Sequence, residues 1–514
     1  MAITKIMASR DEIIFTVSGD FTSNVISEYV PIEGGRLLSE IPACVHEGEI
    51  RIPRFDGARD RLLSKFRTKE DGVCFVSDLM SGASENAREY PQPEIIKALH
   101  GTEEDVKTLG LKQTLLNINI LAIMTVNPKE ETIDYECGGK TYHFIKSRIE
   151  EIDEFLIHMT KLGLITTLIL LNSPRLFNST CEEALLEKAV HPDYEWNAKD
   201  AFLSGFNMVT EEGQGYYQAF VEFLAERYSR ADRKYGCAMG MIISNEVDSQ
   251  CVWSNSGEKT AYEFTKEYTQ ALRIAWLLSH KHYANYRIYI SLDQFFSGMR
   301  FRPTEPLHTY PGREVIDLIN EHAVRDGNFG WFVAYHPYPE DLRYPDFWND
   351  RAPNFTFSTP KITFKNMEVL PAYLAQERLL YEGKPRRIIF SEQGFNSQSG
   401  ALQALTEKQA AAAYVLAYIK ARSIDTCDLF THHAYRDNPH EFGLNLGIRR
   451  YDETKPGGIG EKKPIYESVR KMDTEEENEA VQMARSIIGD ELFDYLLKPQ
   501  IISGEAEDLS TSFG

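Results

Sequence analysis

The sequence predicts an α/β protein, a (β/α)8 TIM barrel with a small N-terminal β-rich domain. Short apolar segments alternate with amphipathic ones between about residues 90 and 475, eight apolar segments can be counted, and a carboxylate closes two of them. An open, doubly wound sheet is the rival, but no glycine-rich phosphate-binding turn follows an early strand. We therefore expect a β-rich accessory domain at 1–68, the barrel at 69–488 and a C-terminal tail at 489–514.

The composition is that of a globular chain that can bury a large core, with 514 residues of which 42% are hydrophobic. The net charge of −21 argues against nucleic acid or an anionic membrane as a partner, because like charges repel. The seven cysteines are dispersed without a Cys-x-x-Cys pair, which favours reduced thiols. With neither a signal peptide nor a membrane-length apolar run in view, we expect a cytoplasmic protein. The oligomeric state stays open.

Residues 1–68 differ from the rest of the chain in their sequence pattern. Segments 12–17, 24–30 and 49–55 are short, β-branched and bounded by Gly, Pro, Asn and Asp, with no helical period. This pattern predicts a separate β-rich domain. The alternative is an irregular extension packed on the main body.

The barrel elements follow from periodicity. Residues 147–162, for example, carry apolar side chains at 149, 152, 155, 156 and 159, and Gly163 follows them, so this segment is predicted to be a capped amphipathic helix. Strands are predicted near 95–101, 113–120, 164–171, 237–246, 287–293, 331–336, 388–390 and 427–433. Helices are predicted near 103–109, 147–162, 215–229, 258–280, 312–325, 366–381, 406–421 and 464–488.

Two of these strands lead to a glutamate at their C-terminal end, the fourth to Glu246 and the seventh to Glu392. In a closed barrel both strand ends open onto the same face. Glycoside hydrolysis with retention needs such a pair at about 5–5.5 Å, one acid to protonate the leaving oxygen and one carboxylate to attack the anomeric carbon. A charged nucleophile would also raise the pKa of its neighbour and keep that neighbour protonated. The bland alternative is that each glutamate is a structural group paired with a loop arginine.

The residues around these acids resemble clan A of the retaining glycoside hydrolases, which includes cellulases, β-mannanases and β-galactosidases. The similar motifs are Ser244-Asn245-Glu246, Ser391-Glu392-Gln393-Gly394, the His-x-Tyr of His336-Pro337-Tyr338 on the sixth strand, and Lys463-Pro464 before the last helix. The matching residues are few, but they are spread over most of the barrel.

The resemblance implies roles for these residues. Glu246 would be the acid/base, Glu392 the nucleophile, and Asn245 a hydrogen-bond partner of the sugar 2-hydroxyl. The Tyr338 hydroxyl would lie near the nucleophile, with His336 facing the same pocket because residues two apart on a strand share a face. The mechanism needs neither cofactor nor metal.

The sequence also departs from the clan pattern. Several of its families carry an Arg on strand two and a Trp at the end of strand eight, where this chain has Asn117 and Asn119, and His432-His433. A particular family with known specificity is therefore not identified.

Further residues at strand ends have two interpretations each. Asp293 and Asn172 would bind substrate hydroxyls or simply cap their loops. Trp253 and Trp348 would stack on sugar faces or pack the loops onto the barrel. His432 or His433 would contact a sugar hydroxyl; the alternative is a metal site formed by this histidine pair with His336 as a third ligand.

Together these patterns predict a retaining β-glycoside hydrolase that acts on an oligosaccharide or glycoside by double displacement through a covalent glycosyl-enzyme intermediate, with carbohydrate as its partner. Two alternatives stay open, a non-catalytic carbohydrate-binding barrel and a metal-dependent barrel hydrolase. The sugar, the linkage and endo or exo action are not determined.

Overall fold

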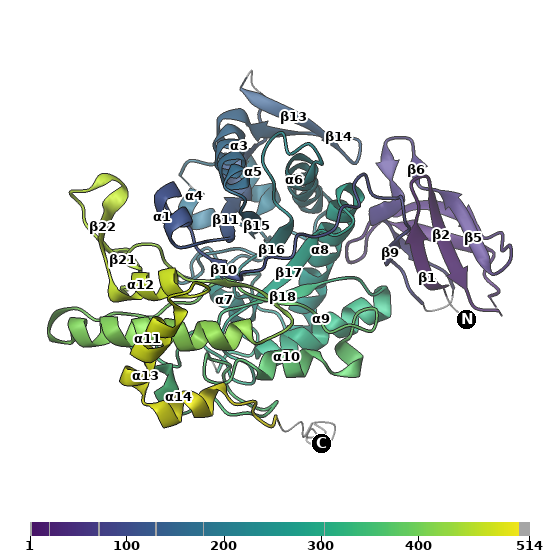
Figure 1. Ribbon diagram of the computed structural model, residues 1–514. Helices are drawn as coiled ribbons and strands as arrows, with labels where there is room; N and C mark the ends of the chain where they lie inside the picture. The colour runs from purple at the N-terminus through teal and green to yellow at the C-terminus, as the bar shows by residue number, and fades with distance from the viewer. Residues whose placement is uncertain are drawn as a thin grey trace.

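A closed barrel of eight parallel strands forms the centre of the protein (Figure 1). The computed structural model describes residues 3–19, 21–69, 72–128, 131–177, 179–302 and 304–502. Neighbouring strands pair in chain order and the last pairs with the first, so the predicted (β/α)8 fold is confirmed. The strands are β10 (Lys97–Ala98), β11 (Gln113–Asn119), β15 (Ile165–Leu171), β16 (Gly240–Ile243), β17 (Arg287–Leu292), β18 (Phe332–Tyr335), β19 (Ile388–Phe390) and β20 (Cys427–Thr431).

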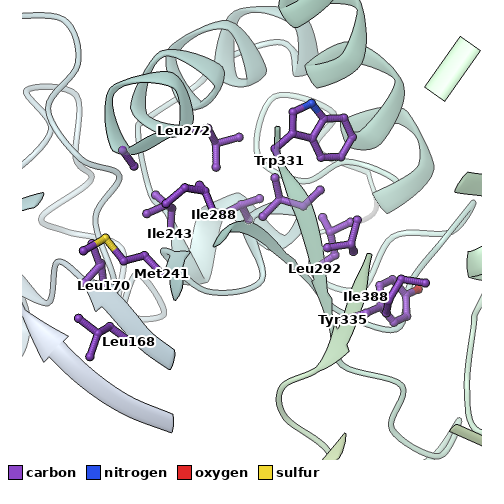
Figure 2. Packing of buried hydrophobic residues seen from close by; sticks show 14 of the residues in the cluster. Leu168, Leu170, Met241, Ile243, Leu272, Ile288, Leu292, Trp331, Tyr335 and Ile388 are labelled. Carbon is purple, nitrogen blue, oxygen red and sulfur yellow. The ribbon is translucent and has the colours of Figure 1, made fainter. Parts of the chain in front are cut away.

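Most residues of the barrel strands are buried because both faces of the strands are covered. Alternate side chains of each strand point to opposite sides. One set packs outward against the helices, as Met241 and Ile243 do near the helix residue Leu272 in Figure 2. The other set fills the barrel interior and comprises Ala98, Ile242, Tyr289, Ala334, Ile389 and Leu429.

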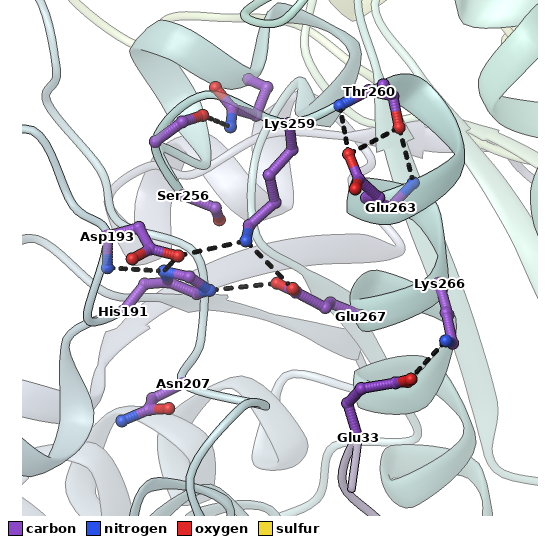
Figure 3. Close-up of polar contacts among 12 residues, drawn as sticks. Glu33, His191, Asp193, Asn207, Ser256, Lys259, Thr260, Glu263, Lys266 and Glu267 are labelled. Atoms are coloured by element: carbon purple, nitrogen blue, oxygen red, sulfur yellow. Dashed lines mark hydrogen bonds and ion pairs between the residues drawn. The ribbon is translucent and has the colours of Figure 1, made fainter.

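The helices around the barrel begin and end where their sequences provide caps. The N-cap Thr260 of α8 (Ala261–His282) accepts a hydrogen bond from the Glu263 amide, and the Glu263 carboxylate accepts one from the Thr260 amide, a capping box visible in Figure 3. Gly163 follows α3 in a left-handed conformation (φ +79°). Other long helices are α3 (Lys146–Lys161), α6 (Glu211–Ser229), α9 (Gly312–Asp326) and α11 (Gln403–Arg422).

The C-terminal part differs from the prediction. The helix expected at 464–488 is divided into α12 (Pro464–Lys471) and α13 (Glu477–Ile488), and Asp473 between them has a left-handed backbone (φ +62°). The tail expected from 489 is wrong for its first residues, which form α14 (Asp490–Leu497), because Phe493 and Leu496 are buried in the core. The helix expected at 366–381 shortens to α10 (Val369–Leu374).

An insertion after the second barrel strand was not predicted. It is a three-stranded antiparallel sheet of β12 (Met124–Thr125), β13 (Thr132–Cys137) and β14 (Lys140–Ile145). Its Phe144 stacks on Phe223 of α6, with ring centroids 3.9 Å apart. Aromatic packing thus holds the insertion on the barrel helices.

The N-terminal part is rich in strands, and it lies beside α8 at one side of the barrel (purple in Figure 1). The ion pairs Glu33–Lys266 (2.5 Å) and Arg36–Glu211 (2.7 Å) tie it to α8 and α6; Figure 3 shows the first. One sheet has the order β5 (Glu49–Pro53), β2 (Glu12–Val17), β1 (Ile3–Ala8), β9 (Asp78–Leu79), and so extends beyond residue 68. The others contain β4 (Leu37–Pro42), β3 (Val25–Tyr29) and β8 (Lys65–Arg67), and the short pair β6 (Phe55–Asp56) and β7 (Arg59–Asp60).

Among the described helices, none combines the length and the apolar character that crossing a bilayer requires. The seven cysteines are all free, and five of them are buried.

Candidate active site

The end of β16 is strained at the residues that carry the first acid. Ser244 (φ +65°) and Glu246 (φ +36°) both have left-handed backbones, which costs on the order of 1–3 kcal/mol for each residue that is not glycine. The Glu246 amide donates to Ser291 Oγ at 3.0 Å, which anchors this backbone to the next strand. Strain of this kind persists where the surroundings enforce it, and it is common at active sites.

Glu246 and Glu392 converge at the C-terminal face of the barrel. One carboxylate oxygen of each glutamate and a ring nitrogen of His336 all lie within 4.8 Å of one another. His336 Nδ1 lies 2.9 Å from Glu246 Oε1, and its Nε2 lies 3.1 Å from Ser391 Oγ. The Tyr338 hydroxyl donates to Glu392 Oε1 at 3.0 Å. Strands four, six and seven therefore contribute to one hydrogen-bonded cluster.

The charges around Glu246 favour its ionised form. Burial opposes that form, but the hydrogen bond from His336 and the positive charge of Arg300, whose guanidinium lies 3.2 Å away, outweigh burial and lower the pKa of Glu246. Burial would lower the pKa of His336, yet the carboxylates of Glu392 and Glu246 raise it. Both shifts favour the ion pair with the proton on His336, whereas the sequence predicted that Glu246 holds it.

Two further buried carboxyl groups lie beneath Glu246. Asp248 Oδ1 accepts from the Asp293 amide at 3.1 Å, and Ser249 Oγ donates to Asp293 Oδ2 at 3.0 Å. Burial and the neighbouring carboxylate raise the pKa of Asp248 well above its usual range, and burial together with Glu246 raises that of Asp293. Arg300 Nη1 lies 3.8 Å from Asp293 Oδ2 and 3.2 Å from Glu246 Oε2, so this arginine bridges the two acids.

Both glutamates line a cleft of about 1290 Å³. Trp253 and Phe202 stack on one wall, with centroids 5.4 Å apart and an interplanar angle of 27°. Phe442 extends this wall and is 76% exposed. Flat aromatic surfaces of this kind suit the CH-bearing faces of sugar rings.

Ion pairs with α8 hold the loops that carry this aromatic wall. His191 Nε2 lies 3.0 Å from Glu267 of α8, and Lys259 Nζ lies 3.1 Å from the same carboxylate and 3.2 Å from Asp193 (Figure 3). His191 and Asp193 belong to the loop that leads to Phe202, and Lys259 to the loop that follows Trp253. The network therefore fixes both loops to one helix.

The structure gathers most of the predicted site residues. Asn245, Glu246, Trp253, Tyr338, Glu392 and His433 line the cleft, and His336 lies directly beneath it against Glu246.

Four predicted substrate ligands lie outside the cleft lining. Asn172 donates to the carbonyls of Ala189 and Gly205 and so holds a loop. Asp293 is buried under Arg300, as described above. The other two are His432, which bonds the Leu446 carbonyl at 2.9 Å, and Trp348, which packs on Phe347 in the hydrophobic core.

Several site residues were missed from the sequence. Arg300, Lys361 and Glu441 line the cleft but lie on long loops whose course no periodicity predicts. Phe202 also lines the cleft from such a loop. A cluster of aromatic and charged residues in a loop at the barrel mouth was the only signal that could have found them.

The predicted alternative of a metal site made by the paired histidines is not borne out by their contacts. His433 pairs with Glu441 at 3.2 Å, and His432 Nε2 lies 2.9 Å from the Leu446 carbonyl oxygen. Among the described residues, the one group of His, Cys, Asp and Glu side chains spaced for a cation is Glu246, His336 and Glu392.

Fold and site together define a class, a (β/α)8-barrel protein with paired glutamates at the ends of its fourth and seventh strands. The chain belongs to a family of unknown function (DUF5722), whose profile matches residues 89–495. No curated protein matches the sequence.

Solved structures share the barrel at low similarity. One is a family 1 β-glucosidase from Thermotoga maritima, with 12% identity, a TM-score of 0.40, and coverage of 71% of this chain and 84% of that one. The same enzyme in complex with deoxynojirimycin gives a TM-score of 0.41 at 12% identity, covering 74% and 85%. A glucosidase from Croceicoccus marinus has 10% identity, a TM-score of 0.41, and coverage of 79% and 69%. At this level the likeness extends to the fold alone.

Proposed function

We propose that the protein is a retaining β-glycoside hydrolase in which Glu392 is the nucleophile and Glu246 the acid/base. The observation that carries the proposal is the approach of the two carboxyl groups, with one oxygen of each within 4.8 Å. Double displacement needs the two groups at about 5–5.5 Å, whereas an inverting reaction needs room for a water between them, about 6.5–9.5 Å.

Glu392 suits the nucleophile role because it is only partly buried and faces the cleft. The Tyr338 hydroxyl orients one of its oxygens and leaves the other for the anomeric carbon. Attack forms the bond from the carboxylate to the anomeric carbon while the glycosidic C–O bond breaks. The electron pair of that bond leaves with the departing oxygen, which takes up a proton.

Glu246 delivers that proton, and His336 stores it. The two side chains share one proton across a 2.9 Å hydrogen bond, and the apparent pKa belongs to the pair rather than to either residue. Transfer from His336 to Glu246 places the proton beside the leaving oxygen. In the second step Glu246 and His336, which have given up their shared proton, take a proton from water. The oxygen of that water then displaces the sugar from Glu392.

Asn245 and Trp253 complete the substrate contacts. The Asn245 amide lines the cleft beside Glu246 and is available to a sugar hydroxyl. The Trp253 side chain lines the cleft next to Glu246 and helps to lower the pKa of that carboxyl group through a hydrogen bond, so it supports the acid/base while its ring faces the substrate.

A 2-deoxy-2-fluoro aryl β-glycoside tests the assignment. The expected result is one sugar residue attached to Glu392, detected by peptide mass spectrometry, with no label on Glu392→Gln. A panel of aryl β-glycosides supplies the turnover measurement, and the first-formed product should have the β configuration. Label on another residue, or an α product, would overturn the role assignment.

A metal-dependent hydrolase is the second candidate, and the spacing of Glu246, His336 and Glu392 is the observation that favours it. Zinc is commonly held by such a set of carboxylate and imidazole ligands. Metal analysis of the purified protein, with turnover measured before and after chelation, separates the two. Stoichiometric metal and loss of activity on chelation would favour this candidate, and full activity after chelation would favour the two-glutamate mechanism.

A further inference from the structure

Two cations in the lining of the cleft have no ion-pair partner among the described residues. Lys361 and Arg351 both line the cleft, and neither has a carboxylate within 4.0 Å among the described residues. The Lys361 ammonium donates to the Glu340 carbonyl at 2.9 Å and lies 4.5 Å from the centroid of the Phe295 ring. We call Arg300, Arg351 and Lys361 the cationic wall.

The three cations belong to one region of the cleft. Lys361 pairs with Phe295 through a β-bridge, and Arg300 follows a few residues later in the same loop. The Arg351 amide donates to the Glu340 carboxylate at 2.7 Å, next to the carbonyl that Lys361 contacts. The Arg300 side chain is 25% exposed and lies 3.2 Å from Glu246, and both residues line the cleft.

The acids of the cleft outside the catalytic pair already have partners. Glu340 accepts from the amides of Arg351 and Ala352, and burial raises the pKa of Asp350 to about 7, so its charge near Lys361 is reduced at neutral pH. The others are Asp200 with Arg302 (2.7 Å), Asp341 with Arg343 (2.6 Å), Glu441 with His433 (3.2 Å) and Asp346 with the Asn349 amide group (2.9 Å).

Lys361 is partly buried without an ion pair, and burial of a cation is costly. Burial is the largest influence on the pKa of Lys361 and lowers it; the carboxylates of Glu340, Asp350 and Asp293 oppose this shift, and the positive charge of Arg300 adds to it. A bound anion would relieve both effects. Guanidinium groups bind carboxylate, phosphate and sulfate oxygens in a two-pronged geometry, and an ammonium adds a point charge.

We propose that the preferred substrate is a glycoside that carries an anionic substituent, and that the cationic wall binds this substituent. The ligand class comprises sugars with a carboxylate, a phosphate ester or a sulfate ester. This inference rests on the proposed function and specifies its substrate. The net charge of −21 repels anions at long range, so a local group of cations is what an anionic ligand would require.

The first test is a comparison of kcat/KM for four 4-nitrophenyl β-glycosides, namely the glucoside, the glucuronide, the 6-phosphoglucoside and the 6-sulfoglucoside. We expect at least one charged substrate to exceed the neutral glucoside by tenfold or more, and the substrate that does so identifies the source of the charge. A neutral glucoside turned over as well as or better than all three would overturn the inference and leave the proposed hydrolase intact.

Variants then connect the preference to the cationic wall. Lys361→Met and Arg351→Met should each reduce the ratio of charged to neutral kcat/KM at least threefold, and Lys361→Arg should retain it. Lys384→Met removes the same charge at an exposed residue outside the cleft lining and should leave the ratio unchanged. An unaltered ratio in both wall variants would refute the role of the wall.

Equilibrium binding keeps the inference testable if no glycoside is hydrolysed. Calorimetry with glucuronate, glucose 6-phosphate, glucose 6-sulfate and glucose should show tighter binding of one anion, weakened at least threefold by Lys361→Met. Such binding without turnover would refute the proposed hydrolase and support the anionic subsite, and equal binding of glucose and all three anions would refute the subsite.

Discussion

Replacement of Glu246 by Gln tests its role through the leaving group. A general acid contributes about 10²–10⁴-fold to cleavage of a substrate whose leaving group is a poor one. Leaving groups that depart as stable anions need little protonation. We therefore expect kcat/KM for a simple alkyl or phenyl glycoside to fall within that range, and kcat/KM for a dinitrophenyl glycoside to fall far less.

The structure sets what else this substitution changes. Gln keeps an oxygen for His336 but removes the charge that Arg300 and His336 face. Asp293, 3.8 Å from Arg300, remains to hold the guanidinium. The stability loss should therefore stay below the roughly 3–5 kcal/mol of a fully orphaned buried charge. A shift in Tm measured beside the kinetics separates this loss from the catalytic one.

The assay is a plot of log kcat/KM against the pKa of the leaving phenol for the wild-type and variant proteins. The variant should show a steeper negative slope. Glu441→Gln is the matched control, because Glu441 lines the same cleft and pairs with His433; its slope should match that of the wild type. An equal loss for all leaving groups in Glu246→Gln would refute general-acid catalysis by this residue.

Three further substitutions have defined outcomes. Tyr338→Phe removes the 3.0 Å hydrogen bond to Glu392, and such a bond to a charged group is worth about 1.5–3 kcal/mol, so kcat/KM should fall about 10- to 150-fold; an unchanged value contradicts the orienting role. Arg300→Met removes a cation that lowers the pKa of Glu246, so the acid should keep its proton to higher pH. The basic limb of the pH–kcat/KM profile should therefore move to higher pH, and a shift to lower pH would contradict this electrostatic account. Asp428→Asn breaks the buried 2.6 Å pair with Arg287 and should lower the free energy of unfolding in urea by about 3–5 kcal/mol, against about 0–1 kcal/mol for Asp341→Asn at the exposed pair with Arg343; equal losses would show that burial does not set the cost.

The barrel was predictable because its strands and helices have local periodicity. Continuous apolar runs such as 388–390 and the stripe at 147–162 specify element type without knowledge of their neighbours. The division of the last helix at Asp473 and the packing of Phe493 in α14 were not predictable in the same way. They depend on contacts with α11, which lies far away in the sequence.

The sequence by itself determined the pair of acids. Glu246 and Glu392 end strands whose order follows from the alternation of elements, and closure of a barrel brings the ends of its strands to one face. The resemblance of His336-Pro337-Tyr338 to the His-x-Tyr of clan A suggested that these two side chains lie beside the acids, and the two-residue period of a strand put both on one face.

Tertiary structure alone decided the surroundings of that pair. Arg300, Lys361 and Arg351 reach the cleft through loops with no repeating pattern, and Asn172, Asp293, His432 and Trp348 turn away from it to satisfy hydrogen bonds or packing in the interior. Burial and the charges brought together across the barrel also decide whether the shared proton favours Glu246 or His336. Electrostatic energies depend on distances in space, and the order of residues along a loop does not contain those distances.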